Sequence, residues 1–180
     1  MVADQIQYSE RIVAFIDILG FGKMIEQSYD SDQGKTNTDH LRKVVSALKT
    51  VHGTFDSDAK EYRNWEVTLF SDSAIVSFPY NAPSEVFHIL LSLLHMNMEL
   101  LRIGVVCRGA IVKGMCYHNN NVVFGPAVNE AYRLESKKSE NPRIIIEKSV
   151  LRAGVEYHAR HNSPEGEKES IRSLVALDDS

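Results

Sequence analysis

Two aspartates stand where apolar runs meet turn-forming residues. Asp17 ends the apolar run Val13–Ile16, and Asp72 lies in the turn-forming cluster Ser71–Ser73 between two further apolar runs. Hard divalent cations prefer oxygen ligands, and they stabilise the attacking and leaving oxygens of a phosphoryl displacement. If the strands pair, the two carboxylates face one another and predict a metal site. The alternative is that Asp17 caps the following helix and Asp72 is only a turn residue.

A glycine turn follows Asp17 closely. Gly20, Phe21 and Gly22 lead from the predicted strand into a helical pattern. Backbone N–H groups at the start of a helix bind phosphate groups, helped by the positive end of the helix dipole. Because a triphosphate and the metal that neutralises it lie close together, this turn is predicted to bind phosphates.

Asn129 and Arg133 are four residues apart on a predicted helix and so share one of its faces. An amide there can hold a ribose, and a guanidinium can stabilise charge on a transferring phosphate. Spacing alone does not decide between these roles and an exposed helix on which Arg133 pairs with Glu130 or Glu135.

The order of the predicted elements indicates how these residues are positioned. Apolar β-branched runs predict strands, and apolar steps of three and four residues predict helices. Strands are predicted at 11–17, 67–70, 74–78, 103–115, 122–124 and 144–146, and helices after Gly22, at 41–53, from Pro83 to Leu101 and from Gly125. This order predicts an α+β fold with a ferredoxin-like split βαβ core, in which a mixed, mostly antiparallel sheet has helices on one face and 144–146 is a central strand.

The bulk properties predict one ordinary globular domain over residues 1–180, with a polar tail after about residue 152. A net charge of -4 and a pI near 6.0 argue against nucleic acid as a partner. The polar first ten residues do not resemble a secretory signal, and polar residues interrupt the longest apolar stretch, Val86–Val106. These features predict a cytoplasmic protein that does not bind membranes.

Cysteine and histidine are not expected to bind metal. Cys107 and Cys116 lack the CxxC spacing and are predicted to be buried free thiols. The seven histidines do not show zinc-ligand spacing; His118 is predicted to lie in a loop, and none receives a role.

Three motifs resemble those of the class III adenylyl and guanylyl cyclases. Phe15–Gly22 (FIDILGFG) resembles the first metal motif of that family, and Phe70–Ala74 (FSDSA) resembles the hairpin that bears the second metal aspartate. Gly125–Glu135 (GPAVNEAYRLE) resembles the helix of pattern GxxVNxAxRxE and is the most specific match. With the strand at Pro142–Ile146, the resemblance spans about residues 11–151 and implies the class III cyclase fold.

The resemblance also implies a role for each matching residue. Asp17, Asp72 and the carbonyl of Ile18 would bind two divalent metal ions, Mn²⁺ or Mg²⁺, and the glycine turn would hold the phosphates. Asn129 would orient the ribose, and Arg133 would stabilise the transition state. In that family one subunit supplies the aspartates and the other supplies the Asn and Arg, so the resemblance implies an active homodimer.

Two departures from the family concern the nucleobase. ATP-using members have a Lys four residues before the second metal aspartate and an Asp three residues before the glycine of the third motif; here these positions are Thr68 and Val122. A pocket without donors and acceptors that match adenine loses its discrimination for that base. Thr68 and Val122 are therefore the base-pocket candidates, and an adenylyl cyclase is disfavoured.

The short chain, with Arg108–Ile111 and Gly125–Ala127, is most similar to the bacterial pyrimidine cyclases of the Pycsar antiphage defence systems. Those enzymes make cyclic UMP or cyclic CMP, which activates a separate effector. The resemblance implies a uridylate or cytidylate cyclase, with UTP favoured over CTP as substrate. Two alternatives are a purine cyclase that uses GTP or ATP, and a degenerate cyclase-homology module that only binds a nucleotide or dimerises.

Overall fold

A six-stranded sheet organises the protein, whose computed structural model describes residues 6–56, 64–119, 121–138 and 141–176. Its strands run in the order β4-β5-β1-β6-β7, with β8 also paired to β6. All pairs are antiparallel except β6 with β8. The strands are β1 (Ser9–Ile18), β4 (Glu66–Phe70), β5 (Ser73–Pro79), β6 (Cys107–Asn119), β7 (Val122–Phe124) and β8 (Ile144–Ile146).

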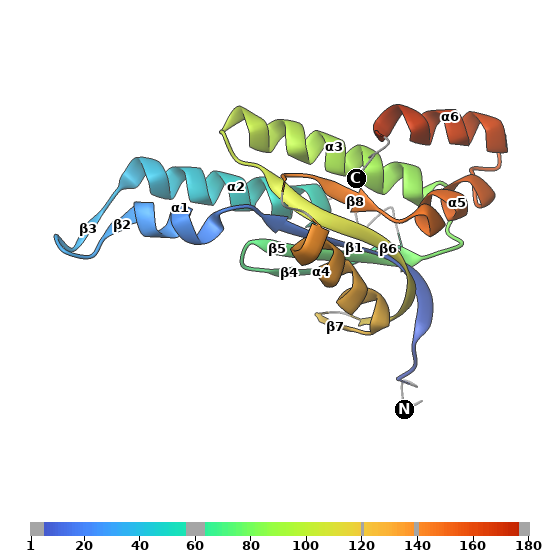
Figure 1. Ribbon diagram of the computed structural model, residues 1–180, viewed down its shortest axis with the longest axis horizontal. Helices are drawn as coiled ribbons and strands as arrows, with labels where there is room; N and C mark the ends of the chain where they lie inside the picture. The colour runs from blue at the N-terminus through green and yellow to red at the C-terminus, as the bar shows by residue number, and fades with distance from the viewer. Residues whose placement is uncertain (1–5, 57–63, 120, 139–140, 177–180) are drawn as a thin grey trace.

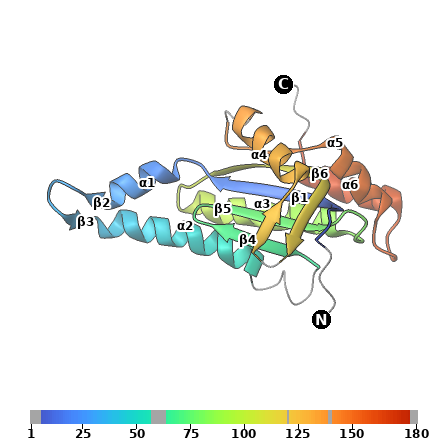
Figure 2. The ribbon, with the colours of Figure 1, turned by 90° about the horizontal axis from the view of Figure 1, so that it is seen from below.

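Helices cover both faces of this sheet (Figure 1). The larger core packs one face of β1, including Ile12 and Ile16, against α2 (Thr38–Asp56), α3 (Glu85–Arg102), α5 (Lys148–Glu156) and α6 (Pro164–Leu174). The smaller core packs Val13 of β1 and Val112 of β6 against α4 (Pro126–Lys138) on the other face. Figure 2 shows α1 (Phe21–Ser28) and the small hairpin of β2 (Tyr29–Asp30) and β3 (Lys35–Thr36) extending beyond the sheet beside α2.

The predicted α+β class and the order of elements are confirmed, with two corrections. Helices were predicted on one face only, but α4 lies on the opposite face. The reason is visible in β1, where Ile12 and Val13 point to opposite faces and both are fully buried. The strand at Ile144–Ile146 was predicted to be central, but β8 pairs only with β6 among the described strands and lies at the edge.

The region after residue 152 contains structure that the sequence analysis did not predict. Ser163 caps α6 by accepting a hydrogen bond from the Gly166 N–H at 3.0 Å, and Pro164 occupies the first turn. Ile171 is only 3% exposed and joins the larger core. The helix was missed because its other residues are mostly polar.

The two cysteines and the apolar character of the helices can be examined in this fold. Cys107 and Cys116 are buried and free, as predicted. Within the ranges given above, none of the helices has the length and apolar character needed to cross a membrane.

Candidate active site

The two aspartates meet where β1 ends beside the β4–β5 turn. In the antiparallel pairing of β1 with β5, Asp17 is opposite Ser73, and the Ile18 N–H donates to the carbonyl of Asp72 at 3.2 Å. The hydroxyl of Ser73 donates to Asp17 Oδ1 at 3.0 Å. Ser71 has a positive φ of 51°, which forms the tight turn that carries Asp72 to this position. The strand pairing that the metal-site prediction required is therefore present.

Asp17 lies in a site with excess negative charge. Its pKa is raised, first by burial and then by the charges of Asp72 and Glu135, although the hydrogen bond from Ser73 and the charge of Arg108 act in the opposite direction. A carboxylate held in this way is favourable for a cation, since a positive ion relieves both the burial penalty and the repulsion.

Arg108 lies between Asp17 and Glu135 and pairs with both. It was not among the site residues predicted from the sequence. It lies opposite Asp17 in the β1–β6 pairing, and its Nε is 3.7 Å from Asp17 Oδ2. It also forms an ion pair with Glu135 of α4, whose side chain is only 2% exposed. A charged residue opposite Asp17 on the next strand was the available signal, but the sequence alone does not reveal the register.

The glycine turn leaves the start of α1 open. Gly20 has a φ of 76°, in the left-handed region that favours glycine, and precedes the helix without a side-chain cap. A Cβ atom built at Gly20 or Gly22 would meet nothing within 4 Å. The first N–H groups of a helix have no partner inside it, so this end of α1, three residues from Asp17, has donors and room for an anion.

Asn129 and Arg133 lie on the exposed side of α4. Arg133 donates to both carboxylate oxygens of Glu130, at 2.7 and 2.5 Å. Within one chain, the structure thus realises the pairing with Glu130 that was the alternative to a catalytic role, while Glu135 pairs with Arg108 instead. The hydrogen bonds and ion pairs described for Arg133 do not include Asp17 or Asp72.

The two base-pocket candidates both lie near His118. Thr68 Oγ1 of β4 is 2.9 Å from His118 Nε2, and Val122 of β7, 56% exposed, pairs with Asn119 next to His118. The prediction that His118 lies in a loop is wrong, because β6 continues to Asn119 through its ladder with β7. His118 is only 7% exposed, and the sequence analysis did not identify it because the apolar run on which the strand prediction relied ends at Met115.

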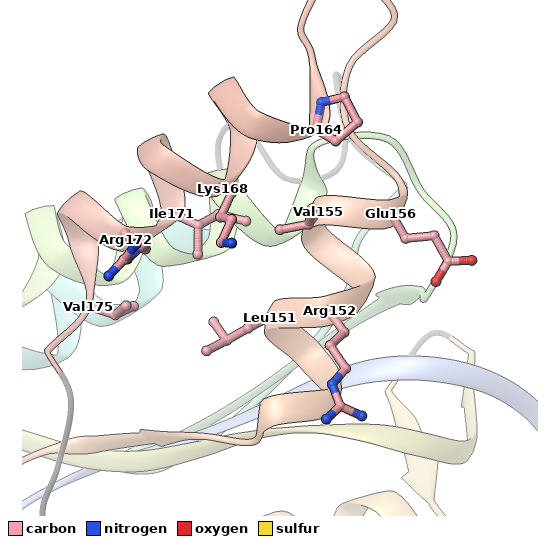
Figure 3. Close-up of a pocket in the computed structure, with 9 residues that line it drawn as sticks. All are labelled: Leu151, Arg152, Val155, Glu156, Pro164, Lys168, Ile171, Arg172 and Val175. Carbon is pink, nitrogen blue, oxygen red and sulfur yellow. The ribbon is translucent and has the colours of Figure 1, made fainter.

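A separate cavity of about 740 Å³ lies between α5 and α6 (Figure 3). Apolar side chains and the cations Arg152, Lys168 and Arg172 line it. None of the predicted site residues is among its lining residues, so it is not part of the candidate active site.

Removing the Arg108 side chain is expected to destabilise the fold strongly. Arg108→Met leaves Glu135 buried without its ion-pair partner, which costs about 3 kcal/mol of unfolding free energy, measurable by urea denaturation at pH 7. The double variant Arg108→Met/Glu135→Leu should recover most of the loss. Arg102→Met is the control, because its ion pair with Glu99 is largely exposed and contributes little. An equal effect of Arg108→Met and Arg102→Met would contradict this assignment.

Solved structures of known proteins share the fold of this chain. No protein-family model and no curated protein sequence matches the chain. Among solved structures, the adenylyl cyclase CyaB from P. aeruginosa aligns with a TM-score of 0.58 and 19% identity over 82% of this chain and 81% of that chain. A bacterial light-regulated adenylyl cyclase gives 0.58 and 17% over 94% and 100% of the two chains, and the guanylyl cyclase Cya2 gives 0.52 and 17% over 82% and 79%. The chain therefore has the fold of class III nucleotidyl cyclase catalytic domains.

Proposed function

We propose that the protein is a homodimeric nucleotidyl cyclase that converts a pyrimidine nucleoside triphosphate, with UTP favoured over CTP, into the 3′,5′-cyclic nucleotide and diphosphate. The observation that carries this proposal is the meeting of Asp17 and Asp72 beside the open start of α1, within a cyclase fold. Similarity to adenylyl and guanylyl cyclase structures supports the reaction class.

The residues at this position fit divalent cations. Asp17, Asp72 and the carbonyl of Ile18 offer only oxygen ligands. The pKa of Asp17 is raised first by burial and then by the charges of Asp72 and Glu135, and a bound cation would offset both. The described residues contain no cluster of three or more His, Cys, Asp or Glu side chains suited to a metal, so water and substrate phosphates would complete the ligand set. Bound Mg²⁺ or Mn²⁺ would neutralise the triphosphate and acidify the ribose 3′-hydroxyl.

The chain itself would position the substrate for an in-line displacement. The N–H groups at Gly20, Phe21 and Gly22 would hold the β- and γ-phosphates. The ribose 3′-oxygen would then attack the α-phosphorus as its proton passes to solvent water, the new phosphoester bond would form, and the bond to the diphosphate leaving group would break. A covalent nucleophile from the protein is not needed.

Asn129 and Arg133 would act on the site of the partner subunit. Both lie on the exposed side of α4, and in the dimer Arg133 would exchange Glu130 for the transferring phosphate. Exposed aromatic residues support a shared interface: Phe70, next to the Asp72 turn, is 79% exposed, and Tyr132, next to Arg133, is 57% exposed. Each half of the proposed composite site thus carries an apolar side chain suited to burial by a second copy.

The choice of a pyrimidine rests on the base-pocket candidates and on the resemblance to the Pycsar enzymes. Thr68 and Val122 replace the pair that reads adenine in ATP-using relatives, and Val122 offers no polar side-chain group to a base. On this proposal the cyclic nucleotide, cyclic UMP, is a second messenger that activates a separate effector in antiphage defence.

Turnover of the four ribonucleoside triphosphates tests the proposal. The purified protein is incubated with each nucleotide and Mn²⁺, and the products are resolved by chromatography and mass spectrometry. We expect cyclic UMP as the main product, in at least about tenfold excess over the other cyclic nucleotides. Dominant cyclic AMP or cyclic GMP would identify a purine cyclase, and no product with any nucleotide would favour a degenerate binding or dimerisation module.

A further inference from the structure

A chain of polar groups crosses the sheet on the face that carries α4. Arg11 of β1 donates from Nε to Ser77 Oγ at 2.8 Å and from Nη2 to the Ser77 carbonyl at 3.1 Å. Ser77 Oγ is 2.8 Å from His118 Nδ1, and His118 Nε2 is 2.9 Å from Thr68 Oγ1. The far end of β6 bends toward β7, and this brings His118 to residues of β4 and β5, although β1 lies between β5 and β6 in the sheet (Figure 1).

Arg11 determines the direction of the hydrogen bonds among these polar groups. Arg11 has only donors, so Ser77 Oγ accepts from it. Ser77 is fully buried, and among the described residues the other side-chain group within hydrogen-bond distance of its Oγ is His118 Nδ1. A buried hydroxyl hydrogen without an acceptor is unfavourable. His118 Nδ1 is therefore the acceptor.

The same direction of hydrogen bonding continues from His118 to Thr68. Burial, and then the positive charge of Arg11, lower the pKa of His118 to about 4, so the ring is neutral at pH 7 and carries one N–H. With Nδ1 as acceptor, that N–H is at Nε2 and donates to Thr68 Oγ1. The hydroxyl hydrogen of half-buried Thr68 is then directed away from His118 and is free to donate to a further group.

Thr68 lies on the same face of the sheet as Asp17. It pairs with Ile75 of β5, which pairs with Phe15 of β1, and Phe15 and Asp17 share one face because they are two residues apart in a strand. Phe15 and Ile75 both pack against the α4-side core. Thr68 therefore lies on the same face of the sheet as Asp17, one of the proposed metal ligands.

We propose that Arg11, Ser77 and His118 are positioning residues that hold the Thr68 hydroxyl as a hydrogen-bond donor, so that Thr68 selects a base with a carbonyl oxygen over one with an amino group. This inference rests on the proposed function and deepens it, because uracil has a carbonyl oxygen where cytosine has an amino group. An amino group at that position leaves the Thr68 hydrogen without an acceptor, which is unfavourable in a half-buried pocket.

Substrate discrimination tests the role of Thr68. Thr68→Val keeps the shape of the side chain and removes the hydroxyl, and it should lower the ratio of kcat/KM for UTP to that for CTP about tenfold. Thr68→Ser should retain the ratio, and His118→Phe should lower it although the Thr68 hydroxyl remains. Thr54→Val is the matched control, since the Thr54 hydroxyl bonds to the Thr50 carbonyl within α2. An unchanged ratio in Thr68→Val, or a wild-type preference for CTP, would overturn the inference.

The tautomer of His118 can be measured without any activity. In ¹⁵N NMR spectra at pH 7, with the signals identified by their absence in His118→Phe, we expect a neutral ring protonated at Nε2. A ring protonated at Nδ1 would overturn the proposed direction of these hydrogen bonds even in an active cyclase. If the Nε2–H tautomer is found but no nucleotide is cyclised, the proposed function fails and the role in base selection fails with it. If cyclisation occurs and the UTP to CTP ratio does not respond to Thr68→Val, only the inference fails.

Discussion

Asp17→Asn is expected to lower cyclase turnover about 1,000-fold and, at neutral pH, to make the folded chain more stable. On the proposed function, activity falls because the amide is a poor ligand for the divalent ions that would bind at Asp17. Stability rises because burial and the charges of Asp72 and Glu135 oppose ionisation of Asp17 more than Ser73 and Arg108 favour it. The gain should be about 1 kcal/mol, as is common when a functional residue that lowers stability is replaced.

The stability gain should depend on pH in a defined direction. The pKa of Asp17 is raised by folding, so the folded state binds a proton more tightly than the unfolded state does. The wild-type carboxyl therefore stabilises the fold at pH values below its unfolded pKa, and this contribution is lost as pH rises through its folded pKa. The advantage of Asp17→Asn should thus be largest at pH 7 and shrink on acidification.

Urea denaturation at a series of pH values and a Mn²⁺ titration of the melting temperature measure these effects. Mn²⁺ should raise the Tm of the wild type and have little effect on Asp17→Asn. Asp39→Asn is the control, because Asp39 forms an exposed pair with Arg42 and should change neither stability nor the response to Mn²⁺ much. An equal rise of Tm in wild type and Asp17→Asn would show that Mn²⁺ binds elsewhere.

Co-expression of Asp17→Ala and Arg133→Ala chains is expected to restore about a quarter of wild-type activity, although each variant alone is almost inactive. In the mixed dimer, one site combines the intact aspartates of the Arg133→Ala chain with the intact arginine of the Asp17→Ala chain. The other site has lost both. Random pairing makes about half of the dimers mixed, and each mixed dimer has one working site of two.

The exposed position of Arg133 is the physical reason for this expectation. Its partner within the chain is Glu130, so within its own chain Arg133 is bonded to a carboxylate and not to the site at Asp17. Co-expression of Asp17→Ala with Asp72→Ala is the matched control, because neither site of that mixed dimer has both aspartates and no activity should return. Failure of the Asp17→Ala and Arg133→Ala pair to exceed its separate components would contradict sites shared between subunits.

Much of the site could be predicted because its groups lie at the ends of local elements. Asp17 follows an apolar β-branched run, Asp72 lies in a turn cluster, and Gly20 precedes a helix. Each of these features can be recognised from a few adjacent residues. Short-range patterns of this kind reflect backbone propensity and burial, which neighbouring residues largely determine. The α+β class followed from the order of such elements.

The partners of these groups could not be predicted in the same way. Arg108 meets Asp17 and Glu135 only through the register of β1 with β6 and the packing of α4 on the sheet. A shift of one residue in that register would turn Arg108 to the opposite face. The tertiary structure therefore decided the charge balance at the predicted metal site.

The sequence by itself determined which residues end strands, open helices and carry the cyclase-like motifs, because those properties depend on neighbours along the chain. Only the tertiary structure decided that α4 packs on the second face, that Ile171 completes the larger core, and that His118 reaches Thr68 across the sheet. These contacts join residues far apart in the chain, and strand register and the bend of β6 bring them together.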